Sequence, residues 1–204
     1  MNEKFFDLKQ EKQDRMINAA LKVFAMNGYQ HASTDEIVKE AGISKGLLFH
    51  YFISKIGLYE FLYDYSARYM QLELRTSISE SETDYFKLIR QEQEAQMEVC
   101  RKYPYMQLFI DRSMTEDVPE AIDVVKEQRI QMQETYDAIL ERVDQSRFPE
   151  DLELIRLHNM LQYTLKALLI EQSQMGTFDP DRYCKEAITY LDMVRTMAYR
   201  FEEQ

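Results

Sequence analysis

The sequence predicts an all-α protein in which a small N-terminal three-helix domain is joined to a larger helical domain. Two observations predict this fold class. Apolar residues recur every three or four positions along most of the chain, which is the spacing of a helix that buries one face. Glycine and proline, which interrupt helices, number only 5 and 4 among 204 residues. We expect the two domains to span residues 1–57 and 58–204.

The first helix is expected over about residues 11–26. Its apolar stripe consists of Met16, Ile17, Ala20, Leu21 and Phe24. It should end at Asn27-Gly28, because both residue types adopt the left-handed conformation that stops a helix.

Residues 33–52 predict two short helices joined by a tight glycine turn, which is a helix-turn-helix. Ser33 is placed to cap the first helix, with Glu36 closing a capping box. Gly42 supplies the left-handed residue that ends this helix. Ser44 then caps the second helix.

The second helix of the motif has two different sides. Leu48, Tyr51 and Phe52 lie on one side, where they can pack inward. The other side presents small, polar and aromatic residues beside a lysine, namely Lys45, Gly46, Phe49 and His50, with Leu47 between the two sides. A helix of this kind is suited to the DNA major groove.

A longer helix follows, capped by Ser54, and it should connect the two domains directly. Lys55 lies in its first turn, where a cation opposes the helix dipole. A DNA phosphate would explain the lysine, since helix N-termini and lysines both bind phosphate.

The order Ala-x-x-x-Phe, Gly-Tyr, Ser-Thr-Asp-Glu-Ile, Ala-Gly-Ile-Ser-Lys-Gly-Leu-Leu-Phe-His-Tyr-Phe, Ser-Lys resembles the DNA-binding domain of the TetR family of bacterial repressors. The resemblance runs from about residue 11 to residue 60. The rest of the chain resembles the family only in length and helical character. The family implies a homodimer on a palindromic double-stranded DNA operator, from which an unidentified small-molecule effector releases it.

Position by position, the resemblance implies that Thr34 and Lys55 contact phosphate. It implies a recognition surface made of Ser44, Lys45, Gly46, Leu47, Phe49 and His50. Many family members have tyrosine at the position of Phe49, so a hydroxyl contact is missing and Phe49 is expected to meet a thymine methyl. Two alternatives stay open: His50 is a surface histidine with no role, and Leu47 packs against a neighbouring residue.

The net charge of −11 is unusual for a DNA-binding protein, but it is unevenly distributed between the two expected domains. Residues 1–57 contain 8 Lys and Arg against 7 Asp and Glu, whereas the remainder contains 17 against 29. The acidity therefore lies in the second domain. A DNA-binding domain of charge +1 predicts modest non-specific affinity and dependence on dimerisation.

The second domain is expected to hold helices separated by clear breaks. A polar loop covers residues 77–84, and the helix after it ends near Pro104. A short helix comes next. Pro119, Pro149 and Pro180 then stand near the starts of three further helices, where the missing N–H of proline costs nothing.

The last two helices are the expected dimer interface. Their apolar faces include Leu154, Leu157, Leu161, Leu165, Leu168, Leu191, Val194 and Ala198. The alternative is that one stripe closes the core of its own protomer, and because a helix has room to do both, a mixed role is favoured. A C2 dimer would match a palindromic operator.

A small-molecule pocket is expected among the helices of residues 84–175. The candidate lining is Gln93, Gln96, Met97, Tyr103, Phe109, Tyr136, Gln162 and Tyr163, each of which has ordinary core or surface packing as its alternative. The acidity and aromatic content of the domain suit a lipophilic cation.

Other functions have little support in the sequence. We expect no catalytic site, metal site or cofactor, because no hydrolase, metalloprotease, phosphate-loop or dinucleotide motif occurs and the three histidines are scattered. The two cysteines form no C-x-x-C pair, and the apolar run at residues 167–170 is too short for a bilayer, so a cytoplasmic protein with inert thiols is expected. A helical adaptor whose C-terminal domain binds a protein partner is the alternative function, and it would leave a large apolar patch uncovered.

Overall fold

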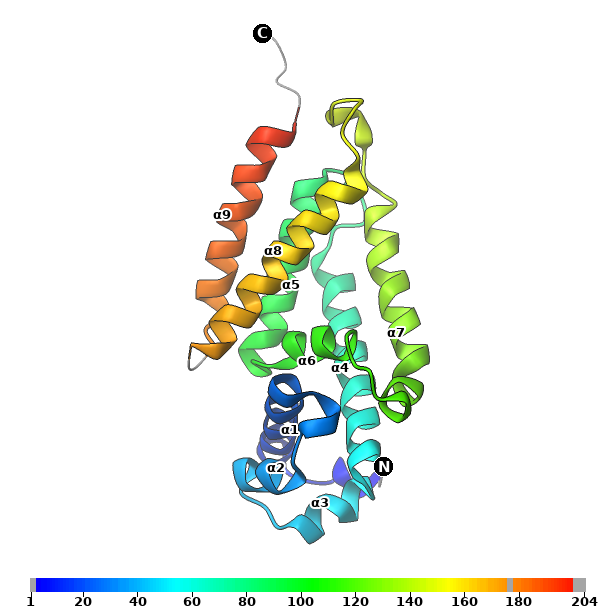
Figure 1. Ribbon diagram of the computed structural model, residues 1–204, viewed down its shortest axis with the longest axis vertical. Helices are drawn as coiled ribbons and strands as arrows, with labels where there is room; N and C mark the ends of the chain where they lie inside the picture. The colour runs from blue at the N-terminus through cyan, green and yellow to red at the C-terminus, as the bar shows by residue number, and fades with distance from the viewer. Residues whose placement is uncertain (1–2, 176–177, 200–204) are drawn as a thin grey trace. The chain divides into compact units, whose positions relative to one another are not determined.

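The computed structural model describes residues 3–175 and 178–199. Over these residues the chain forms α-helices and two short 3-10 helices, and it contains no strand, which confirms the all-α prediction. In chain order the elements are η1 (Glu3–Phe5), α1 (Gln10–His31), α2 (Thr34–Ala41), α3 (Lys45–Phe52), α4 (Lys55–Ser77), α5 (Tyr85–Lys102), α6 (Met106–Ser113), α7 (Pro119–Leu140), η2 (Gln145–Arg147), α8 (Leu154–Gln174) and α9 (Pro180–Ala198) (Figure 1).

The helices divide into two compact units. The first comprises Met1–Gln71 and Val99–Glu134, and the second comprises Leu72–Glu98 and Thr135–Gln204. The helices α4, α5 and α7 each contribute to both units. Residue 57, the predicted domain boundary, lies within the continuous helix α4.

Gly28 interrupts the helix where the sequence predicted its end, and a further helical turn after this kink extends α1 to His31. Gly28 has φ 70° and ψ 175°, and helical backbone resumes after it to His31. The carboxylate of Glu116 accepts a hydrogen bond from the Tyr29 amide at 2.8 Å. The kink leaves the Tyr29 amide without an acceptor inside the helix. Because Glu116 supplies the acceptor, the helical turn after Gly28 can form.

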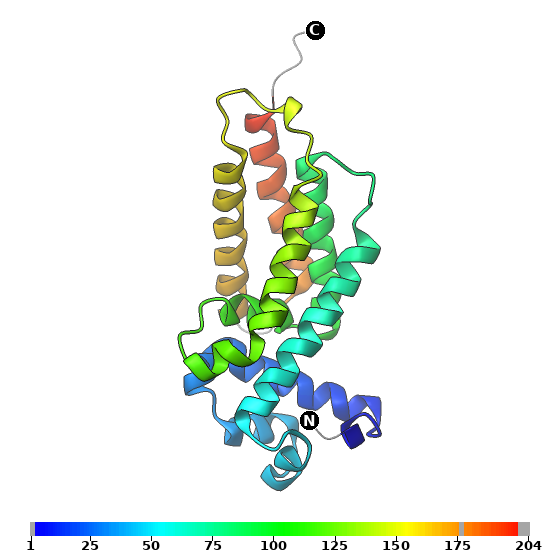
Figure 2. The ribbon, with the colours of Figure 1, turned by 90° about the vertical axis from the view of Figure 1, so that its right-hand side faces the viewer.

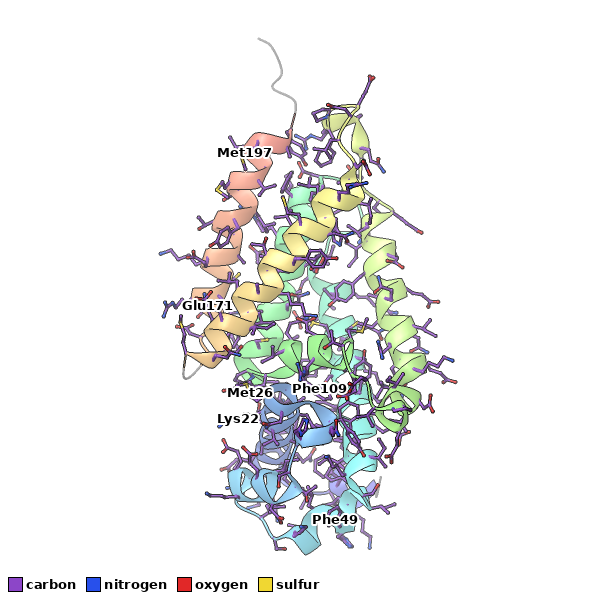
Figure 3. All side chains as sticks on the ribbon, in the orientation of Figure 1. Lys22, Met26, Phe49, Phe109, Glu171 and Met197 are labelled. Atoms are coloured by element: carbon purple, nitrogen blue, oxygen red, sulfur yellow. The ribbon has the colours of Figure 1, made fainter. Side chains whose placement is uncertain are left out.

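The core of the first unit is aromatic. The Tyr59 ring meets those of Phe24, Tyr29 and Phe109 edge-on, at centroid distances of 5.2, 5.2 and 5.4 Å. Phe109 belongs to α6, which packs against α1 (Figure 3). These edge-to-face pairs stabilise the unit beyond the area that they bury.

In the second unit, α8 and α9 lie side by side (Figure 1, Figure 2). Residues that the sequence placed in the dimer interface are here buried within their own chain, namely Leu161, Leu165, Leu191, Val194 and Ala198. A side chain already covered by its own protomer has little surface left for a partner. These five residues therefore form the core of the unit, while Leu154, Leu157 and Leu168 are half-buried.

A buried carboxylate joins three separate parts of the second unit. Asp84, which is 3% exposed, precedes α5 and accepts hydrogen bonds from the Lys87 amide at 3.1 Å and the Tyr199 hydroxyl at 2.8 Å. Its other oxygen pairs with Arg147. Burial alone would raise the pKa of Asp84, but these hydrogen bonds and the charge of Arg147 hold it below its ordinary value.

Within the described ranges, no helix is both long enough and apolar enough to span a lipid bilayer.

Candidate nucleic-acid interface

The helix-turn-helix is formed by α2, α3 and the turn at Gly42. Gly42 has φ 63° and ψ 42°, and its amide donates to the carbonyls at the end of α2. Ser44 caps α3, since its hydroxyl accepts a hydrogen bond from the Leu47 amide at 3.2 Å. Ser33 occupies the N-cap position of α2 but makes no side-chain capping bond, so the predicted capping box is not formed.

The two sides of α3 differ as the periodicity predicted. Leu48, Tyr51 and Phe52 are buried. The candidate recognition residues lie on the accessible side: Ser44, Lys45, Gly46 and His50 are exposed, and Leu47 and Phe49 are half-buried. Phe49 is labelled in Figure 3. Thr34 is half-buried at the first position of α2. The helix-turn-helix therefore presents the candidate base-reading side chains to solvent from a helix anchored on its opposite side.

An exposed ion pair links the two helices of the motif. Lys45 Nζ lies 2.8 Å from an Asp35 oxygen, and both side chains are at least half exposed. Such pairs contribute about 0–1 kcal/mol. The lysine can therefore exchange this carboxylate for a DNA phosphate at small cost.

Lys55 has partners inside the protein. Its Nζ donates to the Gln30 carbonyl at 3.2 Å and lies 4.6 Å from the centroid of the Tyr29 ring. Desolvation lowers the pKa of Lys55, and the nearby carboxylates of Glu116 and Glu120 oppose this shift. The cation in the first turn of α4 thus has a structural reason, which sequence reasoning missed, in addition to the predicted phosphate contact.

The turn between α3 and α4 is tight. Ile53 has φ 66°, its side chain is exposed, and the Ser54 amide donates to the Phe52 carbonyl at 2.7 Å. Ser54 also caps α4, accepting from the Gly57 amide at 3.1 Å. A side chain at residue 57 would collide with the Phe52 carbonyl oxygen. Sequence reasoning missed the roles of Ile53 and Gly57, because neither belongs to a recognisable turn motif.

Three of the candidate pocket residues lie together in the second unit. Gln96 accepts a hydrogen bond from Gln93 at 3.1 Å and donates to the Tyr136 hydroxyl at 3.3 Å. The network continues through Tyr183, whose hydroxyl donates to Gln93 at 3.0 Å. Met97, from the same helix as the two glutamines, is also buried in this unit.

The other candidate pocket residues are placed elsewhere. Tyr103 belongs to the first unit, where its hydroxyl donates to Asp14 at 2.8 Å. Phe109 belongs to the aromatic core of that unit. Gln162 is half-buried and Tyr163 is exposed on α8. The eight predicted residues therefore do not converge on one site.

In the part of the chain that is described, no group of three His, Cys, Asp or Glu side chains is placed to hold a metal ion. Neither Cys100 nor Cys184 forms a disulfide bond, and burial raises the pKa of the Cys100 thiol to about 12. A thiol with so high a pKa has little of the reactive thiolate at neutral pH.

Residues 16–62, which include the helix-turn-helix, match the family described as bacterial regulatory proteins of the tetR family. These residues form a DNA-binding domain of the TetR family. Over 48 residues the chain is 50% identical to YuxN, an uncharacterized HTH-type transcriptional regulator of Bacillus subtilis. Over 49 residues it is 45% identical to UidR, an HTH-type transcriptional regulator of Escherichia coli. These matches cover 24% of the chain but only 16% of YuxN and 25% of UidR.

Solved structures share the fold of this chain along nearly its whole length. A TetR family transcriptional regulator from Chloroflexus aurantiacus superposes with a TM-score of 0.69, covering 98% of this chain and 99% of its own, at 21% identity. CprB from S. coelicolor gives a TM-score of 0.63, covering 96% and 93%, at 17% identity. At these identities the likeness concerns the fold alone.

Proposed function

We propose that this chain is a DNA-binding transcriptional regulator that binds a palindromic operator as a homodimer and is released by a small molecule. The observation that supports this best is the accessible side of α3. It combines a lysine, a glycine, a histidine and two half-buried apolar residues on a helix held by its own buried side. A short helix with such a face fits the major groove, where side chains meet base edges.

The direct test is a footprint of the purified protein on DNA flanking its own gene, at two salt concentrations. A protected palindrome with half-sites about one turn of 34–36 Å apart is the expected result. If there is no protection, a random-sequence selection follows. Failure of both experiments with a folded dimer would contradict DNA binding.

Lys55→Ala should weaken binding to operator and to random DNA alike, and lower the salt slope by about one for each protomer. The reason is that a phosphate contact carries no base information.

His50→Ala should change sequence preference instead, by about 1–3 kcal/mol at one base pair. Lys185→Ala, an exposed lysine on α9, is the control. Equal losses on both DNAs for His50→Ala would contradict its base-reading role.

The proposed dimer surface is the exposed apolar side of α8 and α9. It consists of Ile155, Met160, Tyr163 and Ile170 on α8 and Met193 and Met197 on α9. Met197 is labelled in Figure 3. Most of the residues that helical periodicity predicted for the dimer interface do not belong to this surface, because their side chains face inward. Exposed apolar side chains gathered on two neighbouring helices are typical of a surface that another protein covers.

Met193→Glu should raise the dimer dissociation constant by about 100-fold, because twofold symmetry brings two desolvated carboxylates into one interface. Ile130→Glu on α7 is the matched control, since Met193 is 53% exposed and Ile130 is 51% exposed. Sedimentation equilibrium measures both variants. A wild-type monomer, or a dimer that Met193→Glu leaves intact, would favour the reading in which this surface binds a different protein.

We place the effector site near the hydrogen-bonded network of the buried residues Gln93, Gln96 and Tyr183 and the half-buried Tyr136. These side chains offer hydrogen-bond donors and acceptors inside a helical core, which is the composition of a small-molecule site. A ligand acts by its difference in affinity between the operator-bound and released states. To test whether the effector is a lipophilic cation, such compounds are added to the complex of the protein with the footprinted operator. A compound of this class that acts as effector should displace the protein from the DNA.

A further inference from the structure

The short helix η1 lies against the last turn of α3. Phe5 is 0% exposed, and its ring centroid lies 5.6 Å from that of Tyr51, 5.0 Å from that of Phe52 and 5.4 Å from that of Phe61. Tyr51 and Phe52 form the C-terminal turn of α3, and Phe61 belongs to α4. A single side chain therefore joins the end of the recognition helix to the helix after it. We call residues 3–9 the anchor segment.

The anchor segment is itself tied to α1. Gln13, a buried residue of α1, donates through its amide nitrogen to the Phe6 carbonyl at 3.2 Å and to the Leu8 carbonyl at 2.8 Å. The Leu8 amide donates to the Phe5 carbonyl at 3.3 Å. These bonds give the segment a defined backbone, so that Phe5 is held in one place relative to α1.

Helix α3 depends on such support. It has only eight residues, and it ends at Ile53, whose positive φ is costly for a β-branched side chain. The ring of Tyr51 meets that of the exposed His50 at 5.1 Å. Phe5 thus contacts a residue that contacts a candidate base-reading side chain.

We propose that Phe5 is a positioning residue for DNA recognition, and that the anchor segment holds the last turn of α3 in the orientation that base reading requires. Phe5 precedes the segment 16–62 that matches the TetR family, so the family pattern does not assign it this role. The proposal rests on the proposed DNA-binding function.

Base contacts and phosphate contacts should respond differently to the loss of Phe5. Hydrogen bonds to base edges need side chains held within about 0.5 Å and 10–20° of their best geometry. Phosphate contacts give affinity without sequence information. A loosened α3 should therefore lose operator affinity while keeping its affinity for random DNA, whereas an unfolded domain would lose both.

The experiment compares Phe5→Ala with Met26→Ala, in the full chain, on the best duplex from a random-sequence selection and on a scrambled duplex. Met26 is the control, because it is a large apolar residue of α1 that is 44% exposed and lies outside the anchor segment. Phe5→Ala should weaken operator binding by about 10- to 100-fold, the loss of about one base contact per half-site, and change scrambled-duplex binding by less than about twofold. Met26→Ala should leave both affinities near the wild-type values.

Circular dichroism melting checks that each variant is folded at the temperature of the binding measurement. If Phe5→Ala is not folded, Phe5→Leu decides, because it keeps an apolar side chain but loses the ring contacts. It should lower the ratio of operator to scrambled affinity by about fivefold or more. A Phe5 variant that keeps the wild-type ratio, or that loses both affinities equally while folded, would overturn the positioning role. Wild-type protein that selects no sequence would overturn the DNA-binding function, and this inference with it.

Discussion

Replacing Asp84 by alanine is expected to lower the free energy of unfolding by about 3 kcal/mol. The carboxylate accepts hydrogen bonds from an amide, a hydroxyl and a guanidinium, and hydrogen bonds to charged groups contribute about 1.5–3 kcal/mol each. The desolvation of the buried carboxylate offsets part of this total. Arg147 is about half exposed and can return to water when its partner is lost, which keeps the expected effect moderate.

Urea unfolding of wild type and Asp84→Ala measures this difference. Asp192→Ala is the control, because Asp192 forms an exposed ion pair with Arg90 and should change stability by about 1 kcal/mol or less. If the two variants lost similar amounts of unfolding free energy, the buried Asp84 would contribute no more to stability than the exposed Asp192.

The same carboxylate predicts the direction of a pH effect. Because the pKa of Asp84 is lower in the folded protein than its ordinary value of 3.8, its contribution to stability is fully present above that value. The contribution is lost as the pH falls through the folded-state pKa. The stability difference between wild type and Asp84→Asn should therefore shrink as the pH is lowered below about 4.

Gly57→Ala is expected to destabilise the helix-turn-helix by about 1–3 kcal/mol and to weaken operator binding. A methyl group at this position would collide with the Phe52 carbonyl, a backbone atom that cannot rotate away. The turn between α3 and α4 would have to open, and α3 would move with it. The loss should exceed the roughly 1 kcal/mol that alanine normally gains over glycine within a helix.

Gly46→Ala is the matched control, because Gly46 also lies in a helix and a Cβ there would meet nothing within 4 Å. It should raise stability by about 0.5–1 kcal/mol. The comparison is made on thermal unfolding, since Gly46 lies on the proposed DNA surface and a methyl group could alter binding directly. Gly57→Ala is expected to lower the stability and Gly46→Ala to raise it. A stabilised Gly57→Ala protein would contradict the close approach of the Phe52 carbonyl to residue 57.

The alternative of an adaptor protein and the proposed homodimer both use the exposed side of α8 and α9. The sequence predicted these helices and left open the alternative that one stripe closes the core of its own protomer. Leu161, Leu165 and Leu191 are buried within their own chain. Helical periodicity shows that a helix has an apolar side, but it gives no information on which protein covers that side.

The sequence by itself determined the features that depend on near neighbours along the chain. The left-handed Gly42, the Ser44 cap and the inward side of α3 each follow from residues within one or two helical turns. Backbone conformation and helix caps are set by such short-range contacts, so a sequence pattern is sufficient to predict them.

The tertiary structure alone decided the contacts between residues far apart in the chain. The burial of Phe5 against α3 and α4, the bond from Lys55 to Gln30, and the joining of Asp84 to Tyr199 have no counterpart in local sequence. Each depends on how helices pack, which is settled by the summed burial of many side chains together. The sequence therefore determined where the recognition helix lies in the chain, and the packing decided what holds it in place.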